Sequence, residues 1–280
     1  MNTITDTAEF EREFGTRPGT PMIGPYSVNQ MDDFYAALAR GEVKPTGVMN
    51  YLQRLFIAER TRPGDRVVDV CCGRGLQLPP LYRYCSALGS YVGLDISAAN
   101  LEQAHQRVDE LNNLYPESRF PIEFYRTDVA EPWPELEPAD VAVYTSALEH
   151  LPRELGVASL ERTAAALADG GVLYLSTPNT PGDPPRRLQH RVHVYEWSHE
   201  ELAAVLEQVG LVVRNIVGIL PPATTEAAEE AVKQRWGSGA LEFYRHMADN
   251  TPAALLGPVT ATALDTAASE VLYVCARSEQ

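Results

Sequence analysis

Residues 67–75 read Val67-Val68-Asp69-Val70-Cys71-Cys72-Gly73-Arg74-Gly75 and join a short apolar run to two glycines. An apolar run of this kind is typical of a buried strand, and glycines directly after it let the backbone turn and approach a ligand closely. The first amide groups of a helix that follows are free to bind the ligand as well. The stretch therefore predicts a strand, a ligand-binding turn and a helix, which together form the first unit of an open parallel sheet.

Apolar runs and helical patterns alternate along the chain after this turn. Runs bounded by turn residues predict strands at 66–71, 91–95, 122–126, 140–145, 171–177, 211–220 and 270–276. Apolar spacing of three to four residues predicts helices at 97–114, about 155–168 and 198–209, with Ser97 as a capping residue and Asp169-Gly170-Gly171 as a stop. Such strand-then-helix units indicate an α/β fold whose mostly parallel sheet is covered by helices on both faces.

Two segments stand outside this alternation. Residues 1–60 form an arm rich in Gly and Pro followed by helices at 32–40 and 47–60, and we expect them to lie on the substrate side as a lid. Residues 61–280 form the main domain, with a helical insertion at about 222–262. Within that insertion we expect two amphipathic helices, 224–236 and 240–249, which add to the lid.

Composition limits the partners of the protein. The chain has 280 residues, of which 45% are hydrophobic, and 23 Lys and Arg stand against 38 Asp and Glu, so the formal net charge is −15. An acidic surface repels nucleic-acid duplexes and anionic membranes, so we expect neither as a partner, whereas an oligomer is compatible with the sequence. The first fifteen residues lack the apolar stretch of a signal peptide, and four cysteines are too few for a disulfide framework. We therefore expect a reduced, cytoplasmic protein.

An acidic residue lies at the end of the second predicted strand, after the glycine turn. Asp95 ends the second predicted strand, twenty residues after Gly75, where a carboxylate can accept hydrogen bonds from a ribose diol. Two ligands use this geometry, a dinucleotide or an adenosine with a short tail. The dinucleotide fingerprint needs a third glycine, and Leu78 occupies that position. The pattern therefore favours the second ligand.

The motifs resemble those of the class I S-adenosylmethionine-dependent methyltransferases. That family has an acidic residue in the first strand followed by G-x-G-x-G, and here Asp69 is followed by Cys71-Cys72-Gly73-Arg74-Gly75, with a cysteine in place of the first glycine. The resemblance continues through Asp95, through Thr127-Asp128-Val129 after the third strand, and through residues 146–152 after the fourth. It covers about residues 60–220 and the final strand, and implies a Rossmann-like seven-stranded sheet whose last strand is antiparallel.

The resemblance also implies a cofactor, S-adenosyl-L-methionine, and a role for each matching residue. Cys71, Gly73 and Gly75 would pass beneath its methionine part, and Asp69 would orient the loop and the amino group. Asp95 would hold the ribose, with Ile96 against the adenine and Asp128 and Val129 at the adenine edge, while Thr145 and Ser146 would face the methyl group. The structural alternatives are that Asp95 is only a helix cap, Asp128 only a turn residue, and Cys71 and Cys72 only small buried side chains.

Histidines and arginines near the expected pocket are candidates for the acceptor side. A hydroxyl acceptor gains from a base with a pKa near neutrality, so His193 and His150 are the candidate catalytic residues, against a purely structural role in their loops. Arg187, His190, Arg191 and Tyr195 lie in the long loop 179–197 and are candidate substrate-binding residues. Paired surface arginines, and a Tyr195 that anchors the next helix, are the alternatives. No metal site is expected.

These observations favour a small-molecule methyltransferase, directed to a hydroxyl and acting in a biosynthetic pathway. Methylation of carbon or nitrogen on an anionic small molecule is an open alternative, because the acceptor atom leaves no mark in the sequence. An NAD(P)-dependent oxidoreductase and a non-catalytic module that binds S-adenosylmethionine are the others.

Overall fold

The computed structural model describes residues 45–85 and 87–277, so the expected arm at 1–30 and the helix at 32–40 lie outside the described residues. Seven strands form one sheet in the order β3-β2-β1-β4-β5-β7-β6. All neighbouring pairs are parallel except those of β7, which runs antiparallel to β5 and to β6. The predicted Rossmann-like sheet with an antiparallel last strand is confirmed. Its strands are β1 (Arg66–Val70), β2 (Ser90–Asp95), β3 (Ile122–Arg126), β4 (Ala139–Thr145), β5 (Leu167–Pro178), β6 (Leu211–Leu220) and β7 (Glu270–Arg277).

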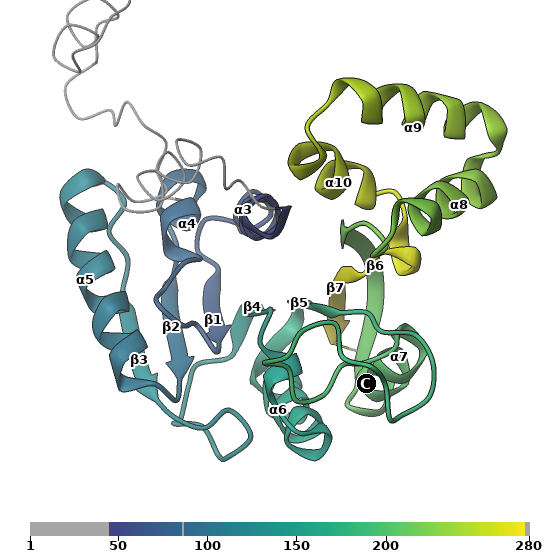
Figure 1. The fold of residues 1–280 in the computed structure, drawn as a ribbon. Helices are drawn as coiled ribbons and strands as arrows, with labels where there is room; N and C mark the ends of the chain where they lie inside the picture. The colour runs from purple at the N-terminus through teal and green to yellow at the C-terminus, as the bar shows by residue number, and fades with distance from the viewer. Residues whose placement is uncertain (1–44, 86, 278–280) are drawn as a thin grey trace, which may run out of the picture.

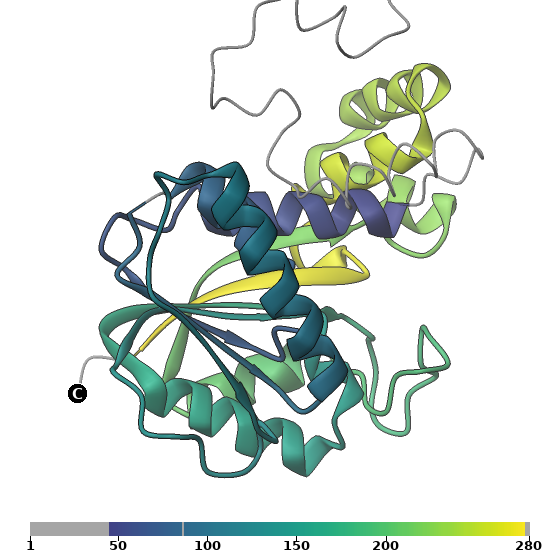
Figure 2. The same cartoon turned by 90° about the vertical axis from the view of Figure 1, so that its left-hand side faces the viewer.

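Helices cover both faces of the sheet (Figure 1). One face carries α3 (Pro45–Ala58), α4 (Leu78–Tyr84) and α5 (Ala98–Leu114), and the other carries α6 (Arg153–Ala166) and α7 (His199–Gln208). Figure 2 shows this layering, with α3 in purple and α5 in dark teal above the sheet and α6 in teal below it. Alternate strand residues therefore enter two separate cores: Val67 and Val143 pack on the side of α3 and α4, whereas Val68 and Ala142 pack on the side of α6 and α7.

The helix ends follow the sequence signals. Ser97 accepts a hydrogen bond from the amide of Asn100, and Ser198 accepts one from the amide of Glu201, so each caps its helix as a side-chain acceptor. Gly210, with φ of +80°, follows the end of α7. These caps start α5 and α7 at the carboxyl edge of the sheet.

Two local predictions were wrong. The predicted helix to residue 168 ends at Ala166, because β5 begins at Leu167, which pairs with Ala139 before the register shifts to Val172 opposite Val141. Asp169-Gly170-Gly171 therefore lies inside a bulged strand.

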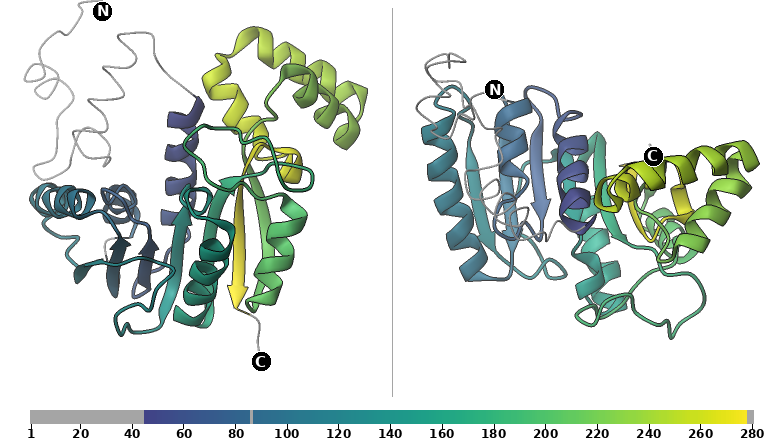
Figure 3. Two further views of the ribbon diagram at one scale, coloured as in Figure 1. Left: turned by 60° about the horizontal axis from the view of Figure 1, so that its bottom comes forward. Right: turned by 45° about the horizontal axis from the view of Figure 1, so that its top comes forward.

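The insertion between β6 and β7 holds three helices, where two were predicted. They are α8 (Thr225–Trp236), α9 (Ser238–Asn250) and α10 (Ala253–Ala261). The third was missed because it contains Gly257 and Pro258, both typical of turns. Figure 3 shows the three helices as a group that stands apart from the sheet, and α10 packs against α3. A 3-10 turn, η2 (Asp265–Ala267), leads into β7.

The strand order fixes where a ligand can bind. β1 has β2 on one side and β4 on the other, so the chain reverses its direction of progress across the sheet between β1 and β4. Ligands of open α/β sheets bind in the crevice outside the carboxyl ends of the strands at such a switch point. The loop 179–197 and the inserted helices both project beyond this edge, at the right of Figure 2. Among the described helices, none combines the length and the hydropathy that a membrane span requires.

Candidate active site

The bend after β1 has three residues in the left-handed region, Cys71 at φ +57°, Gly73 at +56° and Gly75 at +68°. The two glycines differ in their surroundings. A Cβ on Gly75 would lie 3.0 Å from Leu78 Cδ1 and 3.4 Å from Ala104 Cβ, so this glycine lets α4 and α5 pack against the bend. A Cβ on Gly73 would meet nothing within 4 Å. Gly73 is therefore the point at which the bare backbone faces open space.

Cys71 takes the left-handed conformation without being a glycine. For most side chains this conformation costs about 1–2 kcal/mol, and such strain is concentrated at functional sites. Burial raises the pKa of the Cys71 thiol to about 12, and burial also raises the pKa of Cys72. Both residues are therefore uncharged thiols, neither of which is bonded to another cysteine. The expectation of a small side chain in the first glycine position agrees with this geometry.

Asp95 joins the second strand to the glycine bend. One carboxylate oxygen accepts from the Gly73 amide at 2.8 Å, and the other accepts from the Ser97 amide at 2.8 Å and from Asn100 Nδ2 at 3.3 Å. A carboxylate has about four lone-pair sites, so these three donors leave about one site for a ligand hydroxyl. Asp95 is both a helix-end residue and a ligand candidate, since the two roles use different lone pairs.

The residues after β2 and β3 lie next to each other. The amide of Thr127 donates to the carbonyl of Asp95 at 3.1 Å, which places Asp128 beside the end of β2. Ile96 is 62% exposed there, an unusual position for a large apolar side chain. Asp128 accepts from the amide of Ala130 at 3.0 Å, so it does stabilise a turn, and Val129 is buried behind it.

Asp69 lies in β1 beneath the bend and is buried. It accepts a hydrogen bond from Tyr91 Oη at 2.6 Å. Burial raises the pKa of this carboxyl to about 7, although Tyr91 and the nearby Arg54 favour its charged form. Asp69 therefore supports the loop from within the core and has no exposed face.

The end of β4 is held by β5. Thr145 pairs with Ser176 in the ladder, and Ser146, at φ +50°, donates its amide to the Ser176 carbonyl at 2.9 Å. Gln53 of α3 donates from Nε2 to Ser146 Oγ at 3.3 Å. This contact brings the helix before the first strand to the carboxyl edge of β4.

Sequence reasoning missed several residues around this bend. Gln53 and Gln77 are buried, and the Oε1 atom of each has no hydrogen-bond partner among the described residues. Gln77 Nε2 donates to the carbonyl of Arg54 at 3.0 Å, so α3 and α4 meet here. Burial lowers the pKa of Arg54 to about 10, and its guanidinium makes no hydrogen bond or ion pair within residues 45–85 and 87–277. For Gln53 and Arg54, the available signal was their position as two polar residues between Leu52 and Leu55.

A second group of side chains lies where the chain leaves β4. Glu149 and His150 belong to the 3-10 turn η1 (Leu148–His150), and His193 comes from the loop after β5. The carbonyl of Glu149 accepts from the amides of Val194 and Tyr195, at 2.8 and 3.2 Å, so this loop is docked on the turn. The structure thus brings the two candidate catalytic histidines together, with ring centres 5.3 Å apart.

Glu196 fixes the conformation of the loop around His193. This buried carboxylate accepts from Thr180 Oγ1 at 2.5 Å, from the Gln189 amide at 2.8 and 2.9 Å, and from His193 Nδ1 at 2.5 Å. Burial favours protonation, but these donors outweigh it and the pKa of Glu196 is lowered. His193 is therefore oriented by a charged carboxylate, as the base of a catalytic dyad or a metal ligand would be.

The other loop candidates divide into two groups. Tyr195 Oη donates to Glu201 at 2.8 Å, and Arg186 forms an ion pair with Glu201 at 2.7 Å, so this end of the loop is an anchor for α7. Arg187, His190 and Arg191 are exposed. Of these loop candidates, the exposed Arg187, His190 and Arg191 are the ones whose side chains are free to contact a ligand.

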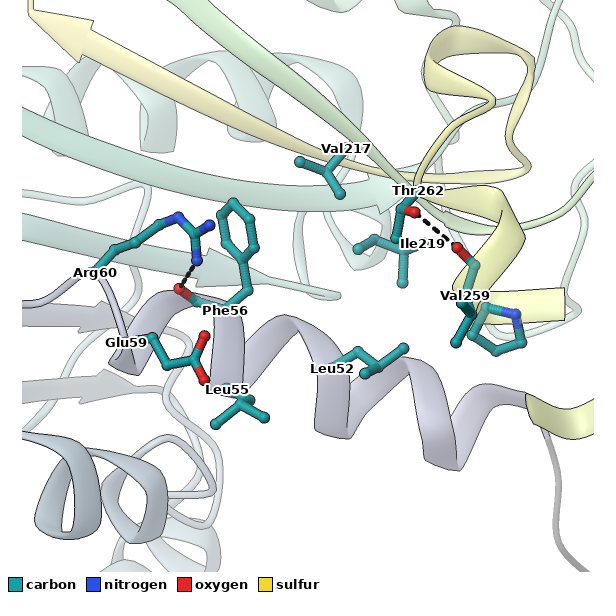
Figure 4. Close-up of a pocket in the computed structure, with 10 residues that line it drawn as sticks. Leu52, Leu55, Phe56, Glu59, Arg60, Val217, Ile219, Val259 and Thr262 are labelled. Carbon is teal, nitrogen blue, oxygen red and sulfur yellow. Dashed lines mark hydrogen bonds between the residues drawn. The ribbon is translucent and has the colours of Figure 1, made fainter. Parts of the chain in front are cut away.

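A separate apolar pocket of about 300 Å³ lies between α3, β6 and α10 (Figure 4). Leu52, Leu55 and Phe56 line it from α3, and Val217 and Ile219 line it from β6. Successive helical residues are about 100° apart, so Arg54 lies on the opposite side of α3 from these side chains. The pocket thus lies on the other side of α3 from Arg54.

Comparison with known proteins identifies relatives of the chain. Residues 45–216 match a family model described as a methyltransferase domain. The ubiquinone biosynthesis O-methyltransferase of Xanthomonas campestris is 30% identical over 210 residues, which is 67% of this chain and 82% of the relative. A trans-aconitate 2-methyltransferase of Methylobacterium nodulans is 33% identical over 150 residues, 49% of this chain and 52% of the relative.

Solved structures show the same fold. The N-methyltransferase NodS of Bradyrhizobium japonicum, in complex with S-adenosyl-L-homocysteine, has a TM-score of 0.54 and 13% identity, and the match covers 86% of this chain and 91% of that one. The matched family region includes the glycine bend, both histidines and Glu196, and it ends before Glu270.

Proposed function

The chain belongs to the class I S-adenosylmethionine-dependent methyltransferases, and from this premise we propose that it methylates a hydroxyl oxygen of a small-molecule acceptor in a biosynthetic pathway. The cofactor, when bound, supplies the electrophilic methyl group on a sulfonium. The protein then has to hold that cofactor, align the acceptor with it and exclude water.

Three observations at the bend fit this cofactor. The space over Gly73 accommodates a ligand against bare backbone. The unpartnered Oε1 atoms of Gln53 and Gln77 are acceptors suited to an ammonium group. Arg54 is a largely buried guanidinium that feels the charge of Asp69 but makes no hydrogen bond or ion pair with a carboxylate of the described residues, and a guanidinium binds a carboxylate with two parallel hydrogen bonds. We therefore assign Arg54 to the carboxylate of the methionine part.

The remaining assignments follow the strand ends. Asp95 would accept from the ribose, Ile96 would pack on the adenine, and Asp128 with Val129 would border the adenine edge. Thr145 and Ser146 would lie beside the methyl group, because β4 ends next to β1 in the sheet. Cys71 and Asp69 would shape the bend without contacting the reacting atoms.

The observation that carries the oxygen-directed proposal is the pair His150 and His193, with Glu196 behind His193. A hydroxyl is a poor nucleophile until its proton is removed or its pKa is lowered, and imidazoles serve this purpose near neutral pH. An amine acceptor that is already neutral has no such need. The Xanthomonas relative is named for O-methylation, which points the same way.

The exposed arginines of the loop bear on the class of acceptor. Arg187, His190 and Arg191 project from the loop 179–197 of a chain with net charge −15. A carboxylate-bearing acceptor would be drawn to this local positive charge. The trans-aconitate relative is named for an acid of that kind.

Transfer of a labelled methyl group tests the proposal. The purified protein is incubated with S-adenosylmethionine carrying a trideuterated methyl group and with three sets of acceptors: hydroxylated aromatic acids, aliphatic carboxylic acids and primary amines. We expect mass spectrometry to place the label on a hydroxyl oxygen, and His193→Ala to reduce turnover while the affinity for S-adenosyl-L-homocysteine is unchanged. Label found only on nitrogen, carbon or carboxylate, or a His193→Ala enzyme with full turnover, would overturn it.

A further inference from the structure

Three side chains near the proposed acceptor side lie close enough to hold one ion. One donor atom each from Glu149, His150 and His193 lies within 4.8 Å of the other two. Two of them come from η1 and the third from the loop after β5, and the docking of that loop on the Glu149 carbonyl keeps the group together. The cluster is thus built by two chain segments more than forty residues apart.

Each imidazole has a hydrogen-bond acceptor at its Nδ1 atom. His150 Nδ1 lies 3.3 Å from the carbonyl of Val192, and His193 Nδ1 lies 2.5 Å from the Glu196 carboxylate. Both partners are acceptors, so in each ring Nδ1 carries the hydrogen and donates it, which leaves a lone pair on Nε2. Metal-binding histidines almost always have this arrangement, with the second nitrogen donating to a carboxylate or a carbonyl.

Three buried carboxyl groups lie at or near the cluster. Glu149, Glu196 and Glu270 are all buried, and no Lys or Arg of the described chain forms an ion pair with any of them. Glu270, at the start of β7, is 7% exposed, and its Oε1 has no hydrogen-bond partner among the described residues. Buried carboxylates are costly unless they are paired or bind a metal.

We propose that Glu149, His150 and His193 bind a divalent transition-metal ion, with Glu196 as the carboxylate that orients His193. Two imidazoles and one carboxylate suit such ions, and three protein ligands leave coordination positions open. This inference rests on the proposed function, because the ion would place positive charge beside the acceptor hydroxyl and lower its pKa. The proposal differs from the sequence-based expectation in two respects. The sequence led us to expect no metal site, and it indicated His193 as a candidate base, whereas here His193 is a metal ligand.

Binding of Mn²⁺ and of Zn²⁺ to the full-length protein, after treatment with EDTA and dialysis, tests the proposal. Free Mn²⁺ is followed by electron paramagnetic resonance and Zn²⁺ by calorimetry. We expect one site per chain for at least one of the two ions, and at least tenfold weaker binding in His150→Ala, in His193→Ala and in the isosteric Glu149→Gln. Glu196→Gln should weaken binding about 10- to 100-fold through the orientation of His193. His246→Ala, an exposed histidine of α9, is the matched control and should bind like the wild type.

The affinity of each variant for S-adenosyl-L-homocysteine is measured in parallel and reports whether the variant is folded. A wild type that binds neither ion at a single site, or folded variants with wild-type metal affinity, would overturn the metal site. If S-adenosyl-L-homocysteine still binds in that case, the proposed function stands without it. A protein that binds the ion through these residues but fails to bind S-adenosyl-L-homocysteine would support the metal site and contradict the proposed function.

Discussion

The Asp95 carboxylate accepts a hydrogen bond from the amide of Gly73 at 2.8 Å, so the acid that ends β2 is joined directly to the bend that follows β1. The two residues belong to different motifs, 22 positions apart. A ligand that lies over Gly73 therefore has Asp95 beside it, and the carboxylate also holds the bend in shape. Loss of the Asp95 side chain should therefore weaken ligand binding for two reasons. The ligand loses a contact, and the bend loses a hydrogen bond that holds its shape.

Asp95→Ala should weaken the binding of S-adenosyl-L-homocysteine at least tenfold. A hydrogen bond to a charged group is worth about 1.5–3 kcal/mol, and about 1.4 kcal/mol corresponds to a tenfold change in affinity. Isothermal titration calorimetry measures the effect, with Asp109→Ala, an exposed charge on α5, as the control. Equal affinities of the two variants would show that Asp95 is only a helix-end residue.

Arg54→Ala should distinguish two parts of the cofactor. We expect the affinity for S-adenosyl-L-homocysteine to fall about tenfold or more, because the carboxylate loses its guanidinium partner. The affinity for 5′-methylthioadenosine, which has no carboxylate, should not change. Arg60→Ala, two residues after the end of α3 and stacked over Phe56, serves as the control. An equal loss for both ligands would contradict the assignment.

Replacing Gly75 by alanine should mainly lower the stability of the fold, whereas replacing Gly73 by alanine should mainly lower the affinity for the ligand. Gly75→Ala adds a methyl group 3.0 Å from Leu78 Cδ1 in a left-handed backbone, so it should lower the free energy of unfolding by more than about 2 kcal/mol. Gly73→Ala has the backbone penalty alone, about 1–2 kcal/mol, but its methyl group enters the space assigned to the ligand. Urea unfolding and calorimetry should show the larger stability loss in Gly75→Ala and, for Gly73→Ala, an affinity loss in a folded protein. Wild-type affinity in Gly73→Ala would place the ligand elsewhere.

Asp69→Asn should remove a pH dependence of stability. The pKa of Asp69 is raised from 3.8 to about 7 in the folded protein, first of all by burial. Between these values the folded state keeps a proton that the unfolded chain has released, so stability falls as the pH rises, by up to about 1.4 kcal/mol per pH unit. Asparagine can still accept from Tyr91 and is neutral throughout.

Urea unfolding at pH 5, 6, 7 and 8 measures this difference. The free energy of unfolding of the wild type should decrease relative to that of Asp69→Asn up to about pH 7 and then level off. A difference between the two proteins that stays constant over this range would mean that Asp69 is charged in the folded state at all these pH values.

The sheet was predictable from local pattern because most strands are apolar runs bounded by turn residues. The strands at 122–126 and 211–220 match the structure residue for residue. The predictions failed where strand pairing or helix packing opposed the local sequence signal. Gly170 and Gly171 resemble a helix stop, yet the pairing of Leu167 with Ala139 continues the strand through them. In α10, Pro258 is buried in a helix that its sequence does not favour.

Many residues of the candidate site were singled out from the sequence, but Gln53, Gln77 and Arg54 were missed, and the sequence did not show which residues meet in the folded chain. Asp95 and Gly73 were singled out separately, and the hydrogen bond between them appears only in the folded chain. Gln53 and Ser146 are 93 positions apart, a distance over which no sequence spacing predicts contact. His150 and His193 were both candidates, whereas their proximity to Glu149 depends on the docking of the loop 179–197.

A crystal structure of the protein with S-adenosyl-L-homocysteine would show where the adenosyl ligand binds relative to the bend after β1. We expect electron density over Gly73, with the ribose hydroxyls at Asp95, the adenine against Ile96 and the carboxylate at Arg54. The same crystals soaked in NAD⁺ should show no ligand at this bend. The account is wrong if the homocysteine compound binds away from Gly73, or if the dinucleotide occupies the bend in its place.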